Sequence, residues 1–203
     1  MIKTLIFDFG NVFINLDIEG AHKYALETFN INTLSEEMTA FNSLYEQGLI
    51  STDEFLEFYA ENFPKLSNDN LINVWNIMLK DFPKHRLEFI KHLKASSKYK
   101  LILLSNTNEL HINWIKENVS FYDDFKNCFD AFYLSHEINL RKPHNAIFEF
   151  VLNENNLKSN ECLFIDDNLD NIKTATNLKF ATWHIKPETE DVTTLFKTKN
   201  KLF

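Results

Sequence analysis

The stretch Thr4-Leu5-Ile6-Phe7-Asp8-Phe9-Gly10-Asn11-Val12 decides the fold of this chain. Leu5 to Phe7 form a short continuous apolar run, which is the pattern of a parallel strand buried on both faces. The run delivers one carboxylate, Asp8, and Gly10 follows two residues later. In open α/β sheets, ligands collect at the carboxyl ends of such strands. We therefore expect Asp8 to lie where a buried strand meets a functional site.

Two further apolar runs also end in polar residues. Residues 100–104 are followed by Ser105-Asn106-Thr107-Asn108, and residues 162–165 are followed by Asp166-Asp167-Asn168. Arg141-Lys142-Pro143 stands between these two segments. If the strands are parallel, their polar ends and one lysine would converge at the same edge of the sheet.

The sequence from Lys84 onward alternates between helical and strand patterns. The expected helices cover 85–94, 109–118, 144–153 and 170–177, and the expected strands cover 100–104, 131–134, 162–165 and 180–185. Alternating β and α units predict an α/β fold with a doubly wound parallel sheet and helices on both faces. The tail, residues 197–201, is expected to be frayed.

Residues 17–82 have a different texture, because they contain no clear buried strand. Apolar residues recur there at helical spacing, and Ser51 with Glu54 matches a capping box. We expect four helices in this region, with the chain returning near Pro83. The predicted division is a core of residues 1–16 and 83–203 with a helical insert at 17–82. The alternative is a helical layer within one continuous domain.

Composition excludes several classes of function. The net charge of the 203 residues is -8, which argues against a nucleic-acid partner because phosphate contacts need clusters of Lys and Arg. The three glycines, Gly10, Gly20 and Gly48, form no glycine-rich phosphate loop. A bound phosphate would instead need a cation, a lysine and amides at strand ends.

The cysteines and the apolar pattern point to a cytoplasmic location. Cys128 and Cys162 are the only cysteines and form no paired framework, which fits a reducing compartment and ordinary core thiols. The N-terminus lacks a secretory pattern, and no apolar run approaches the length of a membrane span. We expect no membrane partner, and the sequence does not indicate an oligomeric state.

The segments at the predicted strand ends resemble the four ordered motifs of the haloacid dehalogenase (HAD) superfamily. The motifs are residues 8–12, Ser105-Asn106, Lys142-Pro143 and residues 166–171. The resemblance covers nearly the whole chain. Residues 104–108 and 164–168 especially resemble the branch that contains bacterial α-D-glucose-1-phosphate phosphatase. The resemblance implies a HAD-like, Rossmannoid core with an inserted α-helical cap domain at 17–82 that closes over the site.

Two adjacent carboxylates beside Asp8 would repel one another and would need a cation. Mg²⁺ suits such a site, because it prefers a few carboxylates together with water and substrate phosphate. The resemblance implies that Asp8 and Asp167 ligate Mg²⁺ through their side chains and Gly10 through its backbone carbonyl. It implies that Asp166 is a direct or water-mediated ligand. Asp8 would be the nucleophile.

The remaining motif residues have simpler alternatives. Ser105 and Asn106, at the start of a helix, suit a phosphoryl group, although Ser105 could equally be a plain N-cap. Lys142 offers a point charge to phosphate or to the nucleophile and is predicted to be both catalytic and substrate-binding. Asn171 falls where the family supports the metal ligands. Arg141 receives no predicted role.

These features predict a Mg²⁺-dependent phosphatase that hydrolyses a small phosphorylated metabolite through an aspartyl phosphate. A sugar phosphate such as a hexose 1-phosphate is favoured. The chain departs from the family pattern at Gly10, where HAD phosphatases usually have the aspartate that acts as general acid and base. The leaving group could need little protonation, Asp17 could supply the proton, or the protein could be slow or inactive. The similar branch also carries Gly here, which favours an active enzyme.

Two other functions stay open. A 2-haloacid dehalogenase would also lack the second aspartate, but such enzymes generally have Tyr there and an Arg soon afterwards, whereas this chain has no Arg before Arg86. The other alternative is a catalytically weak module that binds phosphorylated metabolites. Substrate choice is expected to lie with the cap. Gly48 is a candidate turn facing the site, and Tyr45 or Gln47 is hypothesised to contact substrate, although a core position is also expected for Tyr45.

Overall fold

The computed structural model describes all residues, 1–203, and contains one five-stranded parallel sheet. The strand order is β3-β2-β1-β4-β5. The strands are β1 (Thr4–Phe7), β2 (Lys100–Ser105), β3 (Ala131–Leu134), β4 (Cys162–Asp166) and β5 (Ala181–His184). The predicted doubly wound α/β fold is therefore confirmed, with every expected strand present.

The central strand β1 pairs with β2 on one side and with β4 on the other. Its first residue, Thr4, is in register with Lys100 of β2 and with Cys162 of β4. The chain builds β2 and β3 to one side of β1 before it crosses to build β4 and β5 on the other. The strand order therefore reverses between β1 and β4, and such a switch point is where ligands bind in open α/β sheets.

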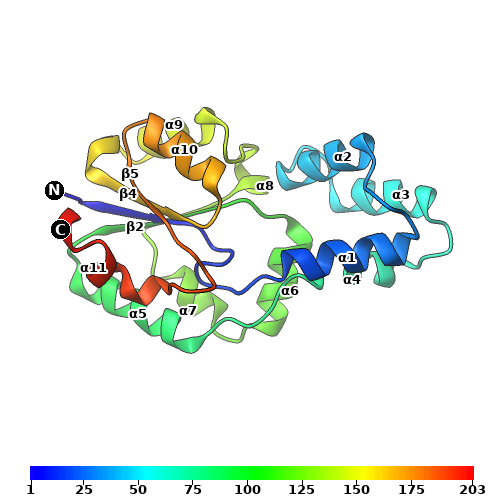
Figure 1. The fold of residues 1–203 in the computed structure, drawn as a ribbon, viewed down its shortest axis with the longest axis horizontal. Helices are drawn as coiled ribbons and strands as arrows, with labels where there is room; N and C mark the ends of the chain where they lie inside the picture. The colour runs from blue at the N-terminus through cyan, green and yellow to red at the C-terminus, as the bar shows by residue number, and fades with distance from the viewer.

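Helices cover both faces of the sheet (Figure 1). Helices α9 (Asn145–Glu154) and α10 (Leu169–Asn177) lie on one face, and α5 (Lys84–Ser96), α6 (Glu109–Asn118) and α7 (Tyr122–Lys126) belong to the other. Successive residues of a strand point to opposite faces. Accordingly, Ile6 is buried in the apolar cluster of α9 and α10, whereas Leu5 and Phe7 are buried in the larger cluster opposite.

The four expected helices of residues 17–82 are all present. They are α1 (Ile18–Phe29), α2 (Glu36–Glu46), α3 (Thr52–Asn62) and α4 (Asn68–Asn76). We refer to these four helices as the cap. The predicted capping box of Ser51 and Glu54 is formed at α3. Helix α4 is capped by Ser67, whose side chain accepts from the amide of Asn70.

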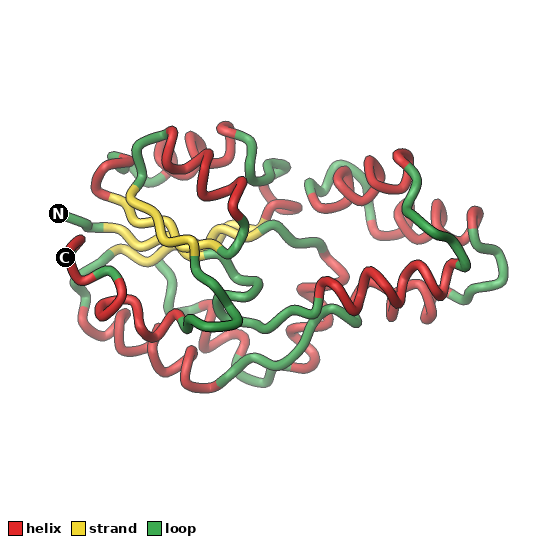
Figure 2. The backbone as a smooth tube through the Cα atoms, in the orientation of Figure 1, coloured by secondary structure: helices red, strands yellow, loops and turns green.

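The cap extends away from one end of the sheet (Figure 2). It has its own cluster of ten buried apolar residues, to which the core contributes Leu110 of α6. The two chain segments that join cap and core run side by side, because Asn15 and Asp81 are linked backbone to backbone at 2.9 Å, as are Asp17 and Met78. This packing favours the expected division at 1–16, 17–82 and 83–203, which stays a prediction.

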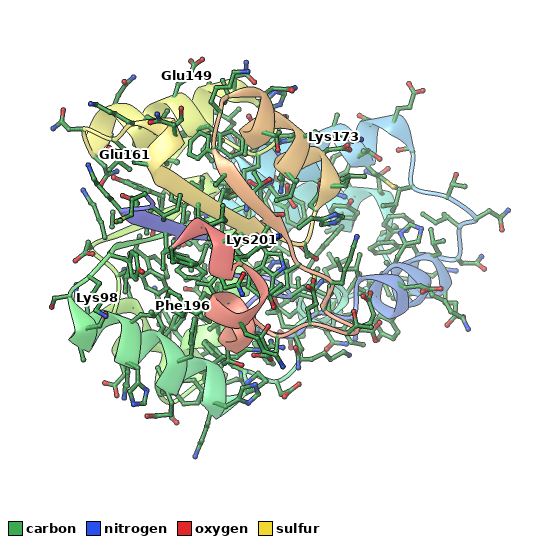
Figure 3. All side chains as sticks on the ribbon, turned by 60° about the vertical axis from the view of Figure 1, so that its left-hand side comes forward. Lys98, Glu149, Glu161, Lys173, Phe196 and Lys201 are labelled. Carbon is green, nitrogen blue, oxygen red and sulfur yellow. The ribbon has the colours of Figure 1, made fainter.

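The C-terminal tail differs from its expectation. Instead of fraying, it forms helix α11 (Leu195–Thr198) and a 3₁₀ turn at Asn200–Leu202. The rings of Phe196, labelled in Figure 3, and Phe203 lie 4.6 Å apart, and both pack near Tyr99. Aromatic contacts with the core therefore order a segment whose composition is largely polar.

Several short elements complete the fold. They are helix α8 (Ser135–Ile138) and 3₁₀ turns at Ser159–Glu161 and Val192–Thr194. Both cysteines are buried free thiols, as expected. None of the helices combines the length and the apolar character that crossing a membrane would require.

A buried arginine ties the C-terminal region to the loop after β1. Arg86 of α5 donates from Nε to Oδ2 of Asp191 at 2.9 Å and from Nη1 to the carbonyl of Phe13 at 3.2 Å. Burial alone would raise the pKa of Asp191, but hydrogen bonds from Thr193, His85 and Arg86 outweigh it and hold that pKa well below its usual range. The charged carboxylate therefore stabilises the fold.

Because the pKa of Asp191 is depressed in the folded protein, its contribution is complete above the unfolded value of about 4 and is lost as the pH falls below it. We expect Asp191→Asn to lower the free energy of unfolding by about 1–3 kcal/mol at pH 7. The difference from the wild type should shrink below about pH 4 in urea titrations. The exposed Asp124→Asn should change stability by less than about 1 kcal/mol, and an equal loss in both variants would contradict the assignment.

Candidate active site

A buried lysine joins the two strand ends that flank the switch point. Nζ of Lys142 lies 2.8 Å from Oδ1 of Asp8 and donates to Oδ2 of Asp166 at 2.8 Å. It also donates to the carbonyl of Leu104 at 2.8 Å. The side chain of Lys142 is 1% exposed, so its three donors are used within the protein. The predicted convergence of these segments is therefore present in the structure.

The position of Lys142 is fixed by Asn106. Nδ2 of Asn106 donates to the carbonyl of Lys142 at 2.8 Å, and the amide of Lys142 donates back to Oδ1 of Asn106 at 2.9 Å. Both polar groups of the Asn106 side chain are thus committed to the backbone of the lysine. The side chain of Asn106 holds Lys142 in place, and only its backbone amide stays predicted for phosphate.

Asp166 is fully buried and surrounded by donors. Its Oδ1 accepts from the amide of Asn168 at 2.7 Å, and Nδ2 of Asn171 lies 3.1 Å from Oδ1 and 3.0 Å from Oδ2. Together with Lys142, these contacts occupy both oxygens. The arrangement favours a supporting or water-mediated place for Asp166 beside a metal ion. Asn171 contacts this carboxylate, and its expected support of the metal ligands stays a prediction.

Asp167 is held by a residue for which the sequence predicted no role of its own. Nδ2 of Asn11 donates to Oδ2 of Asp167 at 2.8 Å, while Oδ1 of Asn11 accepts from the amide of Leu16 at 3.0 Å. Asn11 has a φ of 55°, a left-handed conformation that Asn adopts more readily than most residues. This backbone geometry and the two hydrogen bonds explain why Asn occupies the position after Gly10.

The electrostatics of the site follow from burial and crowding. Burial raises the pKa of Asp8 most, Lys142 lowers it, and Asp166 and Asp167 raise it further, to about 7. Burial would lower the pKa of Lys142, but the carboxylates of Asp166 and Asp8 outweigh it and raise that pKa. Burial also raises the pKa of Asp167. A single lysine therefore leaves the negative charge of three carboxylates incompletely balanced.

The donor set fits a divalent cation. Asp8, Asp166 and Asp167 each offer a carboxylate oxygen, and these oxygens lie within 4.8 Å of one another. Three carboxylates against one ammonium leave an excess of two negative charges when all are ionised. Hard oxygen donors with this charge suit Mg²⁺. The structure thus brings together the predicted metal-ligating side chains.

The other predicted residues stand at the end of β2 or just after β1. Gly10 is in the turn after β1, where it bridges to Ile14, and the metal-binding role of its carbonyl stays a prediction. Ser105 is buried at the end of β2, with Oγ 3.3 Å from the carbonyl of Asn106. The catalytic and binding roles of these residues also stay predictions.

Tyr45 and Gln47, the two residues hypothesised to contact substrate, make hydrogen bonds within the protein. The hydroxyl of Tyr45 lies 2.8 Å from Oγ1 of Thr52 and accepts from the amide of Leu110, and its ring is buried in the cap. Nε2 of Gln47 donates to the carbonyl of Ser43 at 3.0 Å. These contacts favour a structural place for both residues.

Asp17, the carboxylate considered for proton transfer, caps helix α1. Its Oδ1 accepts from the amide of Gly20 at 2.8 Å, and its Oδ2 lies 3.5 Å from Nζ of Lys80. Both oxygens therefore have partners on the cap side of the linker. Asp17 also lines a cavity of about 420 Å³ that reaches Asn11 and Asp167.

Comparison with known proteins agrees with the fold. A family model of haloacid dehalogenase-like hydrolases matches residues 2–178, so the chain belongs to that family, and the predicted resemblance to the HAD superfamily is confirmed. A curated relative, D-ribitol-5-phosphate phosphatase of Bacteroides thetaiotaomicron, is 28% identical over 190 residues, which span 90% of this chain and 91% of the relative.

Two solved structures extend this comparison. A HAD family enzyme from Bacteroides thetaiotaomicron, in complex with magnesium and inorganic phosphate, is 34% identical with a TM-score of 0.82, covering 97% of this chain and 100% of that one. A predicted HAD-like family hydrolase from Porphyromonas gingivalis is 26% identical with a TM-score of 0.83, covering 98% of each chain. The shared fold thus extends through the cap.

Removing the ammonium group of Lys142 should leave two buried carboxylates uncompensated. We expect Lys142→Met to lower the free energy of unfolding by about 3–5 kcal/mol at pH 7 in EDTA, as measured by urea titration. Lys173, labelled in Figure 3, forms an exposed ion pair on α10, so Lys173→Met should cost less than about 1 kcal/mol. A loss of similar size in the two variants would show that Lys142 does not neutralise the site.

Proposed function

We propose that this chain is a Mg²⁺-dependent phosphatase that hydrolyses a small phosphorylated metabolite through an aspartyl phosphate on Asp8. The observation that supports this most is the contact of Lys142 with Asp8 and Asp166. A carboxylate oxygen of Asp167 lies close enough to those of Asp8 and Asp166 for all three to bind one metal ion. The family and the magnesium and phosphate complex of a relative support the same chemistry. Bound Mg²⁺ would neutralise the carboxylates and polarise the phosphoryl oxygens.

Asp8 is suited to nucleophilic attack by its placement. The ammonium of Lys142 contacts Oδ1 of Asp8, so we assign the attack to Oδ2. In the proposed reaction Oδ2 attacks phosphorus in line with the departing oxygen, the P–O bond to the leaving group breaks, and water later hydrolyses the acyl phosphate. In this proposal, the positive charge of Lys142 and the backbone amides at Ser105 and Asn106 would stabilise the phosphoryl oxygens.

Protonation of the leaving group restricts the substrate. Gly10 offers no acid, and both oxygens of Asp17 have partners in the helix cap and at Lys80. A sugar 1-phosphate leaves through a hemiacetal oxygen, which is more acidic than an ordinary alcohol. A hexose 1-phosphate is therefore the favoured substrate, and ribitol 5-phosphate, named by the curated relative, is the second candidate.

A phosphate-release assay tests the proposal. We expect the wild type with Mg²⁺ to release phosphate from at least one sugar or sugar-alcohol phosphate, and EDTA to abolish the release. Asp8→Asn should lower kcat by more than about 10³-fold because it removes the nucleophile. The exposed Asp124→Asn should retain activity.

Other outcomes of this assay would identify the alternatives. Retained turnover in Asp8→Asn would refute the proposed mechanism. Chloride release from 2-chloropropionate without Mg²⁺ would indicate a dehalogenase. Binding of phosphosugar without turnover would indicate a binding module.

A second experiment addresses the missing acid. We expect Gly10→Asp to raise kcat for ribitol 5-phosphate by about tenfold or more, and to raise it less for a hexose 1-phosphate, because general acid catalysis matters more for the poorer leaving group. A Cβ at position 10 would lie 2.6 Å from Cδ1 of Leu16, the far end of a flexible side chain that must rotate. Gly10→Asn imposes the same Cβ without a proton donor and should bring no gain. An equal response of both substrates would contradict the role of leaving-group acidity.

A further inference from the structure

The end of cap helix α2 is bonded to the core segment that leads to the site lysine. Oγ of Ser135 lies 2.5 Å from the carbonyl of Glu46. Nδ2 of Asn139 donates to the carbonyl of Gln47 at 2.8 Å and to that of Gly48 at 3.1 Å. The last turn of α2 and the loop after it therefore rest on residues 135–141.

The two segments approach so closely that one position requires glycine. Gly48 has a φ of 64°, and a Cβ there would lie 2.0 Å from the carbonyl oxygen of His136. The obstructing atom belongs to the backbone of the core, so a side chain at position 48 would push the cap and the core apart. Gly48 thus sets the distance between them.

Arg141 adds an ion pair to this contact between the end of α2 and the core. Its Nη2 donates to Oε2 of Glu46 at 2.7 Å, and its Nη1 donates to Oγ of Ser43 at 3.2 Å. The side chains of Arg141 and Glu46 are 27% and 35% exposed. Burial is the largest influence on Glu46 and raises its pKa, while the guanidinium of Arg141 acts against it.

Arg141 projects from a fixed point of the core. The next residue, Lys142, is held through its backbone by Asn106 and through its ammonium by Asp8, Asp166 and the carbonyl of Leu104. The guanidinium therefore reaches the cap from a segment that the catalytic residues immobilise. A rigid anchor of this kind restrains the cap better than a mobile loop would.

We propose that Arg141 is a positioning residue that holds the end of helix α2 against the core and so keeps the cap over the site. When the guanidinium of Arg141 is removed, Lys142 keeps its own contacts, and the chemistry of the assembled site is retained. However, a smaller fraction of the molecules then has the cap docked over the site, and the apparent affinity for substrate falls in proportion to that fraction. The effect should therefore appear in KM rather than in kcat.

The kinetic test rests on the proposed function and uses the phosphate ester that the wild type hydrolyses fastest with Mg²⁺. We expect Arg141→Met and Glu46→Gln each to raise KM about tenfold and to change kcat less than about twofold. The KM of Arg141→Lys should lie between the KM values of these two variants and that of the wild type. The double variant Arg141→Glu with Glu46→Arg, which exchanges the two charges, should reverse part of the increase in KM. Lys91→Met removes an exposed ion pair with Asp124 that does not involve the cap, and it should leave KM unchanged.

Hydrogen exchange of the full chain without substrate provides a test that needs no turnover. Arg141→Met should speed the exchange of amides in α2 and α3 and leave β1 and β4 unchanged, and Gly48→Ala should do the same. Faster exchange in a protein that hydrolyses no phosphate ester would support the role of Arg141 and refute the phosphatase. Unchanged exchange together with unchanged KM would refute the role of Arg141. A fall in kcat at constant KM would also refute it.

Discussion

The structure of the site depends on one buried ammonium group placed between two carboxylates. Lys142 contacts Asp8 at the end of β1 and Asp166 at the end of β4, two adjacent strands that are separated by most of the chain. Burying these charges is costly unless each has a partner, so the strand ends and the loop of Lys142 must be placed together. Asn106 and the carbonyl of Leu104 supply the remaining hydrogen bonds from β2 and the residue that follows it. The doubly wound sheet supplies these positions because its order reverses between β1 and β4.

The regular part of the fold could be predicted from the sequence because burial on both faces leaves a clear pattern. β1, β2 and β4 are continuous apolar runs, and the amphipathic helices of the cap have apolar residues at helical spacing. Helices α7 and α8 were not predicted, since segments of five and four residues are too short to show a period. The tail was wrongly expected to fray because its order comes from the rings of Phe196 and Phe203 against Tyr99, a contact between residues about 100 positions apart.

The charged members of the site could be predicted, whereas most of the groups that orient them could not. Asp8, Asp166, Asp167 and Lys142 follow apolar strands or stand in an ordered motif, so their type and place point to chemistry. The contacts of Asn11 with Asp167 and of Asn106 with the Lys142 backbone join residues whose separation along the chain gives no signal. Asn11 offered one hint, since asparagine after glycine in a turn is typical of a left-handed residue. The pairing of Arg141 with Glu46 also required the docked arrangement of cap and core.

Gly10 shows where the fold stops determining the chemistry. The nearest atom to a Cβ at this position is the end of the Leu16 side chain, which can rotate, rather than backbone. Leu16 belongs to the linker that pairs with Leu79, and it lines the cavity that also reaches Asn11 and Asp167, so this rotation would occur beside the site. A side chain at position 10 therefore needs a rotation of Leu16 and no movement of the backbone. Under the proposed function, glycine at position 10 would be explained by the substrate, because a proton donor adds little to the rate when the leaving oxygen is already acidic. In the proposed phosphatase, the restriction on substrate would follow from one absent carboxylate, whereas the positions of Asp8 and Lys142 follow from the sheet.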